Sequence, residues 1–167
     1  GYKGILYGGF IATSNGVKLI EYNARFGDPE AMNVLSLLQS DFVDICTSIA
    51  NSNLKNTDIS FLNKASVCKY AVPNGYPNKP IKGEEINVDN VFEPDMLFYA
   101  SVTKEGDRLI LAGSRAVAVV AVEESISEAE KVAENEICSI TGPLFHRKDI
   151  GKESLIQNRI NHMKSIR

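Results

Sequence analysis

The chain has 167 residues, of which 44% are hydrophobic and 23% are charged, and its formal net charge is −3. This composition is typical of globular proteins and excludes collagen-like, mucin-like and wholly disordered chains. The sequence has no basic stripe of the kind that nucleic-acid binders carry, and no stretch approaches the roughly 20 apolar residues of a membrane span. We therefore expect a globular chain that binds neither nucleic acid nor a membrane.

Cysteine and histidine are sparse and scattered. The cysteines are Cys46, Cys68 and Cys138. An odd, unclustered set argues against a disulfide framework and against a Cys-based zinc site, so we expect three buried small hydrophobic side chains. Unpaired cysteines favour a reducing compartment, which predicts a cytoplasmic protein. His146 and His162 are far apart in the sequence, so a His-rich metal site is not expected.

The N-terminal part is predicted to begin with a β-hairpin. Residues 4–13 are rich in apolar and aromatic side chains, and residues 17–23 form a second strand-like run. Between them, Asn15-Gly16 supplies the positive φ angles of a tight turn. Two runs of this kind around a turn dipeptide predict an antiparallel pair of strands.

Two helices are expected after the hairpin. Asp28 is a good N-cap with proline at the next position, which predicts a helix over about 29–39. A second helix is expected to follow a cap at Asp41, with apolar residues on one face. Residues 51–63 are rich in Asn, Ser and Thr, so we place a domain boundary in this connector.

The second half of the chain is predicted to be rich in strands. Ser127 to Glu130 has the pattern of a capping box at the start of a helix. The predicted elements are strands over 65–72, 97–103, 108–112, 116–122 and 144–145, and helices over 127–140 and 152–166.

The end of the second predicted strand carries the side chains most suited to chemistry. Alternate residues of a strand share a face, so Val17, Leu19, Glu21 and Asn23 point the same way. We expect the first two to lie deep in the fold and the last two to offer oxygen atoms at its edge. A carboxylate and an amide carbonyl so placed can bind one hard cation such as Mg²⁺.

Polar residues continue into the loop that follows. Arg25 could hold a carboxylate or phosphate by two-point contact, and Asp28 could receive an amine. By spacing alone the more common interpretation is structural: Glu21 and Asn23 as surface and turn residues, Arg25 and Glu30 as a surface ion pair, and Asp28 as a helix cap. Both interpretations stay open at the level of spacing.

Two segments of the chain resemble a known enzyme family. Residues 4–10 are similar to the Gly-x-Leu-Tyr-x-Gly strand of glycinamide ribonucleotide synthetase, a phosphoribosylamine–glycine ligase of the ATP-grasp superfamily. Residues 21–30 resemble its Glu-Phe-Asn-x-Arg-Phe-Gly-Asp-Pro-Glu, with Tyr22 in place of phenylalanine. Further similar motifs, at 74–77, 113–115 and 147–151, extend the resemblance over essentially the whole chain.

The sequence departs from the family pattern at two places. Tyr99 to Val102 stands where the family often has His-Ala-Gly-Thr, so a role of that histidine does not transfer. Ser114 replaces a glycine. Arg115 and the pair Arg147 and Lys148 have two interpretations, as contacts to substrate or phosphate and as surface ion pairs of little energetic weight.

The resemblance implies an α+β fold in two parts. Residues 1–52 would form the rear part of an ATP-grasp domain with its metal-binding strand, and residues 60–167 a small β-rich carboxy-terminal domain with flanking helices. The chain starts at Gly1 beside a predicted strand and lacks the family's glycine-rich lid and ATP-gripping lysine region. We therefore expect the carboxy-terminal portion of a longer enzyme, inactive without the amino-terminal portion.

The resemblance also implies roles for four residues. The reaction would join glycine to 5-phosphoribosylamine in purine biosynthesis, with ATP as co-substrate and glycyl phosphate as intermediate. Glu21 and Asn23 match the ligands of the Mg²⁺ or Mn²⁺ that bridges the ATP phosphates. Arg25 matches a catalytic position that would orient substrate or the acyl phosphate, and Asp28 would contact the amine or ribose substrate.

Two other functions are compatible with such a fold. A non-catalytic binding or docking module could retain Glu21 and Asn23 as polar hairpin residues only. An ATP-grasp carboxylase is a further alternative. The motif at residues 26–29 argues against it, because by resemblance this motif belongs to the glycine ligase. Because a portion of an enzyme exposes the face that its missing portion covers, we expect self-association or binding to that portion.

Overall fold

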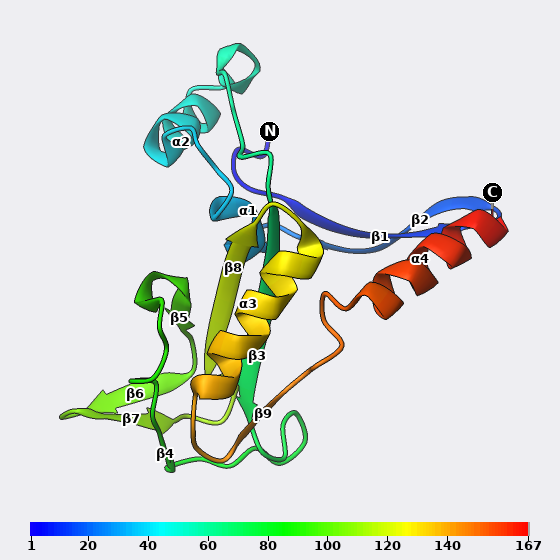
Figure 1. The fold of residues 1–167 in the computed structure, drawn as a ribbon. Coiled ribbons are helices and arrows are strands. Elements are labelled where there is room, and N and C mark those ends of the chain that lie inside the picture. The colour runs from blue at the N-terminus through cyan, green and yellow to red at the C-terminus, as the bar shows by residue number, and fades with distance from the viewer. Residues whose placement is uncertain (167) are drawn as a thin grey trace. The chain divides into compact units, whose positions relative to one another are not determined.

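The structure is a computed structural model that describes residues 1–166, and it divides into two compact units. Unit 1 comprises residues 1–64 together with the C-terminal segment that starts at Glu153, and unit 2 comprises residues 65–152. Helices and strands are mixed in both, so the expected α+β class is confirmed (Figure 1). Among the described residues, no helix is both long enough and apolar enough to cross a membrane.

Unit 1 is built on the predicted hairpin. Its strands pair antiparallel, from Tyr7 opposite Asn23 to Thr13 opposite Gly16, with a bulge between Gly9 and Phe10. Gly16 has a φ of 96°, the left-handed conformation that glycine adopts without strain. The elements of this unit are β1 (Tyr7–Thr13), β2 (Gly16–Asn23), α1 (Glu30–Leu35), α2 (Phe42–Ala50), a 3-10 turn (Leu54–Asn56) and α4 (Glu153–Ile166), which lies beside β1 (Figure 1).

The hairpin face that we expected to be deep is exposed. Val17 and Leu19 are 70% and 48% accessible, so that prediction is wrong. A two-stranded ribbon buries a side chain only where another element packs on it, and among the described residues α4 is the helix that packs against β1.

Helix α1 is shorter than predicted. It ends at Leu35 instead of residue 39, because the backbone beyond it bonds to the connector: Gln39 N–H donates to the Ser60 carbonyl over 3.0 Å. Its N-cap is Pro29, with no side-chain capping bond, so the prediction that Asp28 caps this helix is wrong.

The cap of helix α2 agrees with the sequence prediction. Asp41 accepts hydrogen bonds from the backbone N–H groups of Val43 and Asp44, over 2.7 and 3.2 Å. These two groups would otherwise lack partners at the helix start, so the carboxylate fixes where α2 begins.

Unit 2 contains a four-stranded antiparallel sheet covered by helix α3, and a smaller three-stranded sheet (Figure 1). The strand order of the larger sheet is β5-β8-β3-β9, and that of the smaller is β4-β7-β6. The elements are β3 (Ala65–Pro73), β4 (Glu85–Ile86), a 3-10 turn (Pro94–Met96), β5 (Leu97–Tyr99), β6 (Val102–Glu105), β7 (Arg108–Leu111), β8 (Val117–Glu123), α3 (Ile126–Ser139) and β9 (Leu144–His146).

The core of unit 2 lies between α3 and the central strands. Strand β8 is buried on both faces over its first five residues, which explains its uninterrupted apolar run. Helix α3 contributes small residues, so it can approach the sheet closely. The most buried members of this core are Leu111, Ala116, Val117, Val119, Ala121, Ala129, Ala133 and Ile137.

The predicted strand over 97–103 is two strands in different sheets. β5 ends at Tyr99 and pairs with β8, whereas β6 starts at Val102 and pairs with β7. At the corner, the N–H groups of Ala100 and Ser101 bond to carbonyls just before β8. The predicted hairpin is therefore present, but it is formed by β6 and β7 and begins at Val102.

Helix α3 starts earlier than predicted. Its N-cap is Ser125, which accepts a hydrogen bond from Glu128 N–H over 3.2 Å and donates one to the Glu128 carboxylate over 2.8 Å. The capping box was thus assigned two residues too late, at Ser127, because both registers carry serine followed by glutamate three residues on.

Buried charge is the main feature of unit 2 that the sequence analysis did not anticipate. Lys69, in the middle of β3, is 1% exposed and donates to Glu130 Oε1 over 2.7 Å and to the Glu134 carboxylate. Lys152 also donates to Glu130, over 2.7 Å. The expectation of three buried cysteines is correct for Cys68 and wrong for Cys46 and Cys138, which are exposed on α2 and α3.

Candidate metal and substrate site

The two predicted cation ligands converge at the end of β2. Glu21 lies opposite Gly9 and Asn23 lies opposite Tyr7 in the hairpin register. The Asn23 side-chain amide donates to Glu21 Oε1 over 3.2 Å, so both side chains lie on one side of the strand. With the amide nitrogen directed at the carboxylate, the amide oxygen is left for another partner.

Tyr7 and Glu30 extend this group across the hairpin. The Tyr7 hydroxyl donates to Glu30 Oε1 over 3.0 Å. Gly27 is buried beneath them, and a Cβ there would come within 2.5 Å of Glu30 Oε2 and 3.0 Å of the Tyr7 ring. The absence of a side chain at Gly27 therefore allows the first residue of α1 to reach the hairpin.

The pKa of Tyr7 records this negative surrounding. The hydrogen bond to Glu30 raises the pKa of the phenol, and partial desolvation and the charges of Glu30 and Glu21 raise it further. Each carboxylate disfavours a phenolate nearby. Tyr7 therefore stays a hydrogen-bond donor at neutral pH.

Arg25 and Asp28 lie in the loop between β2 and α1, and both are exposed. The Arg25 guanidinium donates to the carbonyl of Phe26 over 2.7 Å, which folds the side chain along its own loop. The structure thus brings Glu21 and Asn23 into direct contact and places Arg25 and Asp28 on the segment that follows them.

The donor set suits a hard divalent cation. Glu21, Asn23 and Glu30 all offer oxygen, and Mg²⁺ and Mn²⁺ prefer carboxylate and carbonyl oxygens over nitrogen or sulfur. Neither Tyr7 nor Glu30 was predicted to belong to this group. Both fall inside the two segments that resemble the ligase family, which is the signal that could have found them.

The arginines of unit 2 have structural partners. The Arg115 guanidinium carbon lies 5.4 Å from the centre of the Tyr70 ring, a cation–π distance. Arg147 forms a two-point ion pair with Asp149, over 3.0 and 2.5 Å. Lys148 is exposed. These contacts favour the surface-pair interpretation for Arg147.

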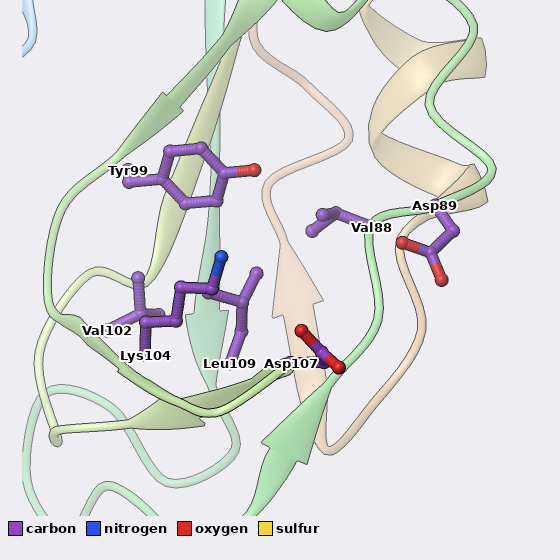
Figure 2. A pocket seen from close by; sticks show the side chains of 7 residues that line it. All are labelled: Val88, Asp89, Tyr99, Val102, Lys104, Asp107 and Leu109. Atoms are coloured by element: carbon purple, nitrogen blue, oxygen red, sulfur yellow. The ribbon is translucent and has the colours of Figure 1, made fainter.

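Unit 2 also has an open cavity of about 430 Å³ beside the smaller sheet (Figure 2). Tyr99, at the position where the family pattern departs, contributes its ring, and Lys104 contributes its ammonium group. The residues predicted for the site lie in unit 1 and do not line this cavity. Its lining consists of Val88, Asp89, Tyr99, Val102, Lys104, Asp107 and Leu109.

Comparison with known protein families gives a consistent result over both units. A model of the phosphoribosylglycinamide synthetase C domain matches residues 66–153, and a model of the ATP-grasp (A) domain of that synthetase matches residues 1–31. The second match contains Glu21, Asn23, Arg25 and Asp28. The resemblance read from the sequence is confirmed.

Individual relatives agree with the family matches. A phosphoribosylamine–glycine ligase of Methanocaldococcus jannaschii is 53% identical over 100% of this chain and 38% of its own length. One from Methanosarcina barkeri is 52% identical with the same coverage. A crystal structure of phosphoribosylamine–glycine ligase from Thermotoga maritima has a similar fold, with a TM-score of 0.70 at 24% identity, over 86% of this chain and 36% of that one. The chain thus spans 38% of the length of these curated relatives.

Proposed function

Since the chain belongs to the phosphoribosylglycinamide synthetase family, we propose that it is part of an ATP-dependent ligase that joins glycine to 5-phosphoribosylamine. The observation that carries this proposal is the contact between Glu21 and Asn23 inside the segment that matches the family's ATP-grasp domain. In this proposal residues 1–52 complete the ATP-grasp domain, and residues 60–167 form the carboxy-terminal domain.

In the proposed reaction the glycine carboxylate attacks the γ-phosphate of ATP, forming glycyl phosphate and ADP. The amine of phosphoribosylamine then attacks the glycyl carbonyl and displaces phosphate. No residue of the enzyme needs to become covalently attached, so the cysteines have no part in the chemistry. Such a reaction depends mainly on positioning and on neutralising charge.

Four residues carry the proposed site. Glu21 Oε and the Asn23 amide oxygen would hold Mg²⁺ or Mn²⁺, which neutralises charge on the ATP phosphates when bound. Arg25 would orient the glycine carboxylate or the acyl phosphate by two-point contact. Asp28 would receive the amine or the ribose of the second substrate. Tyr7 supports the site, because its hydrogen bond holds Glu30 against the hairpin.

The proposed partner of the chain is the amino-terminal portion of the same enzyme. Six large apolar side chains of the hairpin are between 48% and 70% exposed: Phe10, Ile11, Val17, Leu19, Ile20 and Tyr22. An apolar patch of this kind marks a surface that another protein segment covers. We also place the enzyme in the cytoplasm, since its free cysteines fit a reducing compartment.

The test is to join the chain to the preceding portion of the Methanocaldococcus jannaschii relative and to assay release of ADP with glycine and phosphoribosylamine. We expect both substrates to be required and the chain alone to be inactive. Glu21→Gln should raise the Mg²⁺ concentration needed for half-maximal rate and lower the rate by at least about tenfold.

The matched control is Glu105→Gln, an exposed glutamate of β6 in unit 2, which should change neither quantity. Equal metal dependence in the parent protein and in Glu21→Gln would contradict the assigned metal ligand. A fused protein that binds ATP or the substrates but releases no ADP at any metal concentration would instead favour the docking-module alternative.

A further inference from the structure

Three side chains of different chemistry converge within unit 2. Glu134 and Cys138 are one helical turn apart on α3, and His146 ends strand β9. His146 Nε2 lies 3.2 Å from Glu134 Oε1, and Cys138 Sγ lies 3.9 Å from the same oxygen. All three potential ligand atoms lie within 4.8 Å of one another.

These separations fit a tetrahedral metal centre. With Zn–N and Zn–O bonds of about 2.0–2.1 Å and a Zn–S bond of about 2.3 Å, neighbouring ligand atoms lie roughly 3.3–3.6 Å apart. The nitrogen–oxygen and sulfur–oxygen separations of 3.2 and 3.9 Å lie close to this range, and the sulfur–nitrogen separation is at most 4.8 Å, so side-chain rotations would complete the geometry. The mixture of sulfur, nitrogen and oxygen selects zinc over magnesium, which prefers oxygen alone.

The fold holds the carboxylate in the orientation that a metal needs. Lys69 donates to Oε2 of Glu134, so Oε1 is the oxygen that faces Cys138 and His146. A hydrogen bond to the outer oxygen is the usual way in which proteins orient a ligating carboxylate. Lys69 is in turn anchored by Glu130, so the arrangement does not depend on flexible surface side chains.

His146 is held in place by strand pairing. Residue 146 pairs with Ala71 of β3, and its side chain is only 13% exposed. Cys138 is exposed, so a metal ion can reach the three ligand atoms from solvent. This cluster departs from the sequence-based expectation that there is no Cys-based zinc site, because the proximity of Cys138 to His146 depends on the pairing of β9 with β3.

We propose that Glu134, Cys138 and His146 form a zinc-binding site with three protein ligands and a fourth position open to water. Binding breaks the S–H bond of Cys138 and releases its proton to solvent, while the sulfur electron pair forms the Zn–S bond. His146 binds through Nε2 as neutral imidazole, and Glu134 binds through Oε1. The site is independent of the oxygen ligands in unit 1.

The experiment is a titration of the reduced, metal-free chain with Zn²⁺ by calorimetry and with Co²⁺ by absorption spectroscopy. We expect one Co²⁺ equivalent to produce a thiolate-to-cobalt charge-transfer band, which Zn²⁺ then removes. Cys138→Ser should abolish this band. His146→Asn should weaken metal binding. Loss of a group that hydrogen-bonds to a metal ligand lowers metal affinity about 10–100-fold, and loss of the ligand itself should lower it at least as much.

The chain offers a matched control for the cysteine ligand and for the histidine ligand. Cys46→Ser alters the other exposed cysteine and His162→Gln alters the other histidine, and both variants should retain the band. Glu21→Gln should also retain it, which separates this site from the proposed ligase site. The proposal is overturned if the parent chain gives no thiolate band, or if the band survives in Cys138→Ser. Circular dichroism of Cys138→Ser and His146→Asn checks that both variants are folded.

Discussion

The hydrogen bond from Tyr7 to Glu30 links the start of the hairpin to the start of α1. It depends on Gly27, since any larger residue would occupy the space that the Glu30 carboxylate takes. The bond brings a second carboxylate to the side of the ribbon that carries Glu21 and Asn23. Oxygen ligands are therefore concentrated at one end of an otherwise apolar ribbon.

Replacing Glu30 by glutamine tests this arrangement at the residue scale. The carboxylate disfavours the phenolate, so Glu30→Gln should lower the pKa of Tyr7 towards the ordinary value of 10.0. Absorption titration of tyrosinate measures this, with Tyr7→Phe identifying which of the titrations belongs to Tyr7. An unchanged titration curve in Glu30→Gln would show that the two side chains do not interact in solution.

The buried ammonium of Lys69 is the second residue-scale feature. Lys69→Met leaves the buried Glu130 and the partly buried Glu134 with less compensation, and breaking a buried ion pair from one side costs about 3–5 kcal/mol. Urea unfolding of the chain should show this loss. Lys148→Met, at an exposed position, is the control and should lie within about 0.5 kcal/mol of the parent. Equal stabilities of the two variants would contradict the buried network.

At the scale of elements, two serines near the start of α3 have different roles. Ser125 caps the helix through its hydroxyl, whereas Ser127 lies within the first turn. Ser125→Ala should therefore cost about 1 kcal/mol of stability, and Ser127→Ala should change it by less than about 0.5 kcal/mol. Thermal or urea unfolding of the pair decides between the two registers, and the reverse order of effects would restore the capping box at Ser127.

Strand β5 shows how one element can be assigned to the wrong sheet. Residues 97–103 have the composition of one continuous strand, yet the chain turns at Ala100 and Ser101. β5 takes the edge position beside β8, and β6 forms the hairpin with β7. The corner lies beside the cavity of unit 2, so the departure from the family pattern at Tyr99 alters the lining of that cavity.

On the scale of the whole molecule, the exposed hairpin governs behaviour in solution. Six large apolar side chains of β1 and β2 are between 48% and 70% exposed, and α4 packs against β1. We expect the isolated chain to associate in a concentration-dependent way, measured by sedimentation velocity. Leu19→Ser combined with Ile20→Ser should shift the equilibrium towards the monomer.

The control for association is Phe92→Ser. Phe92 is 82% exposed and belongs to unit 2 and not to the hairpin, so its removal should leave association through the hairpin unchanged. A parent chain that stays monomeric at high concentration would contradict the prediction. Loss of association on fusion to the amino-terminal portion would support the proposed partner.

Much of the fold was predictable because its signals are local. Asn15-Gly16 specifies a turn, Asp41 caps α2, and the apolar run that became β8 fitted a buried strand better than a membrane span. The family was also readable, since residues 21–30 carry a dense and ordered motif. From period-2 alternation alone it followed that Glu21 and Asn23 share a face, and they do.

The remaining features depend on contacts between distant parts of the chain. The depth of Val17 and Leu19 depends on what covers the ribbon, which alternation cannot reveal. Lys69 is buried because α3 supplies two carboxylates that lie more than sixty residues away in the sequence. Cys138 and His146 meet because β9 pairs with β3. Local patterns encode strand, turn and motif, whereas burial and the meeting of side chains follow from packing, which a single stretch of sequence does not contain.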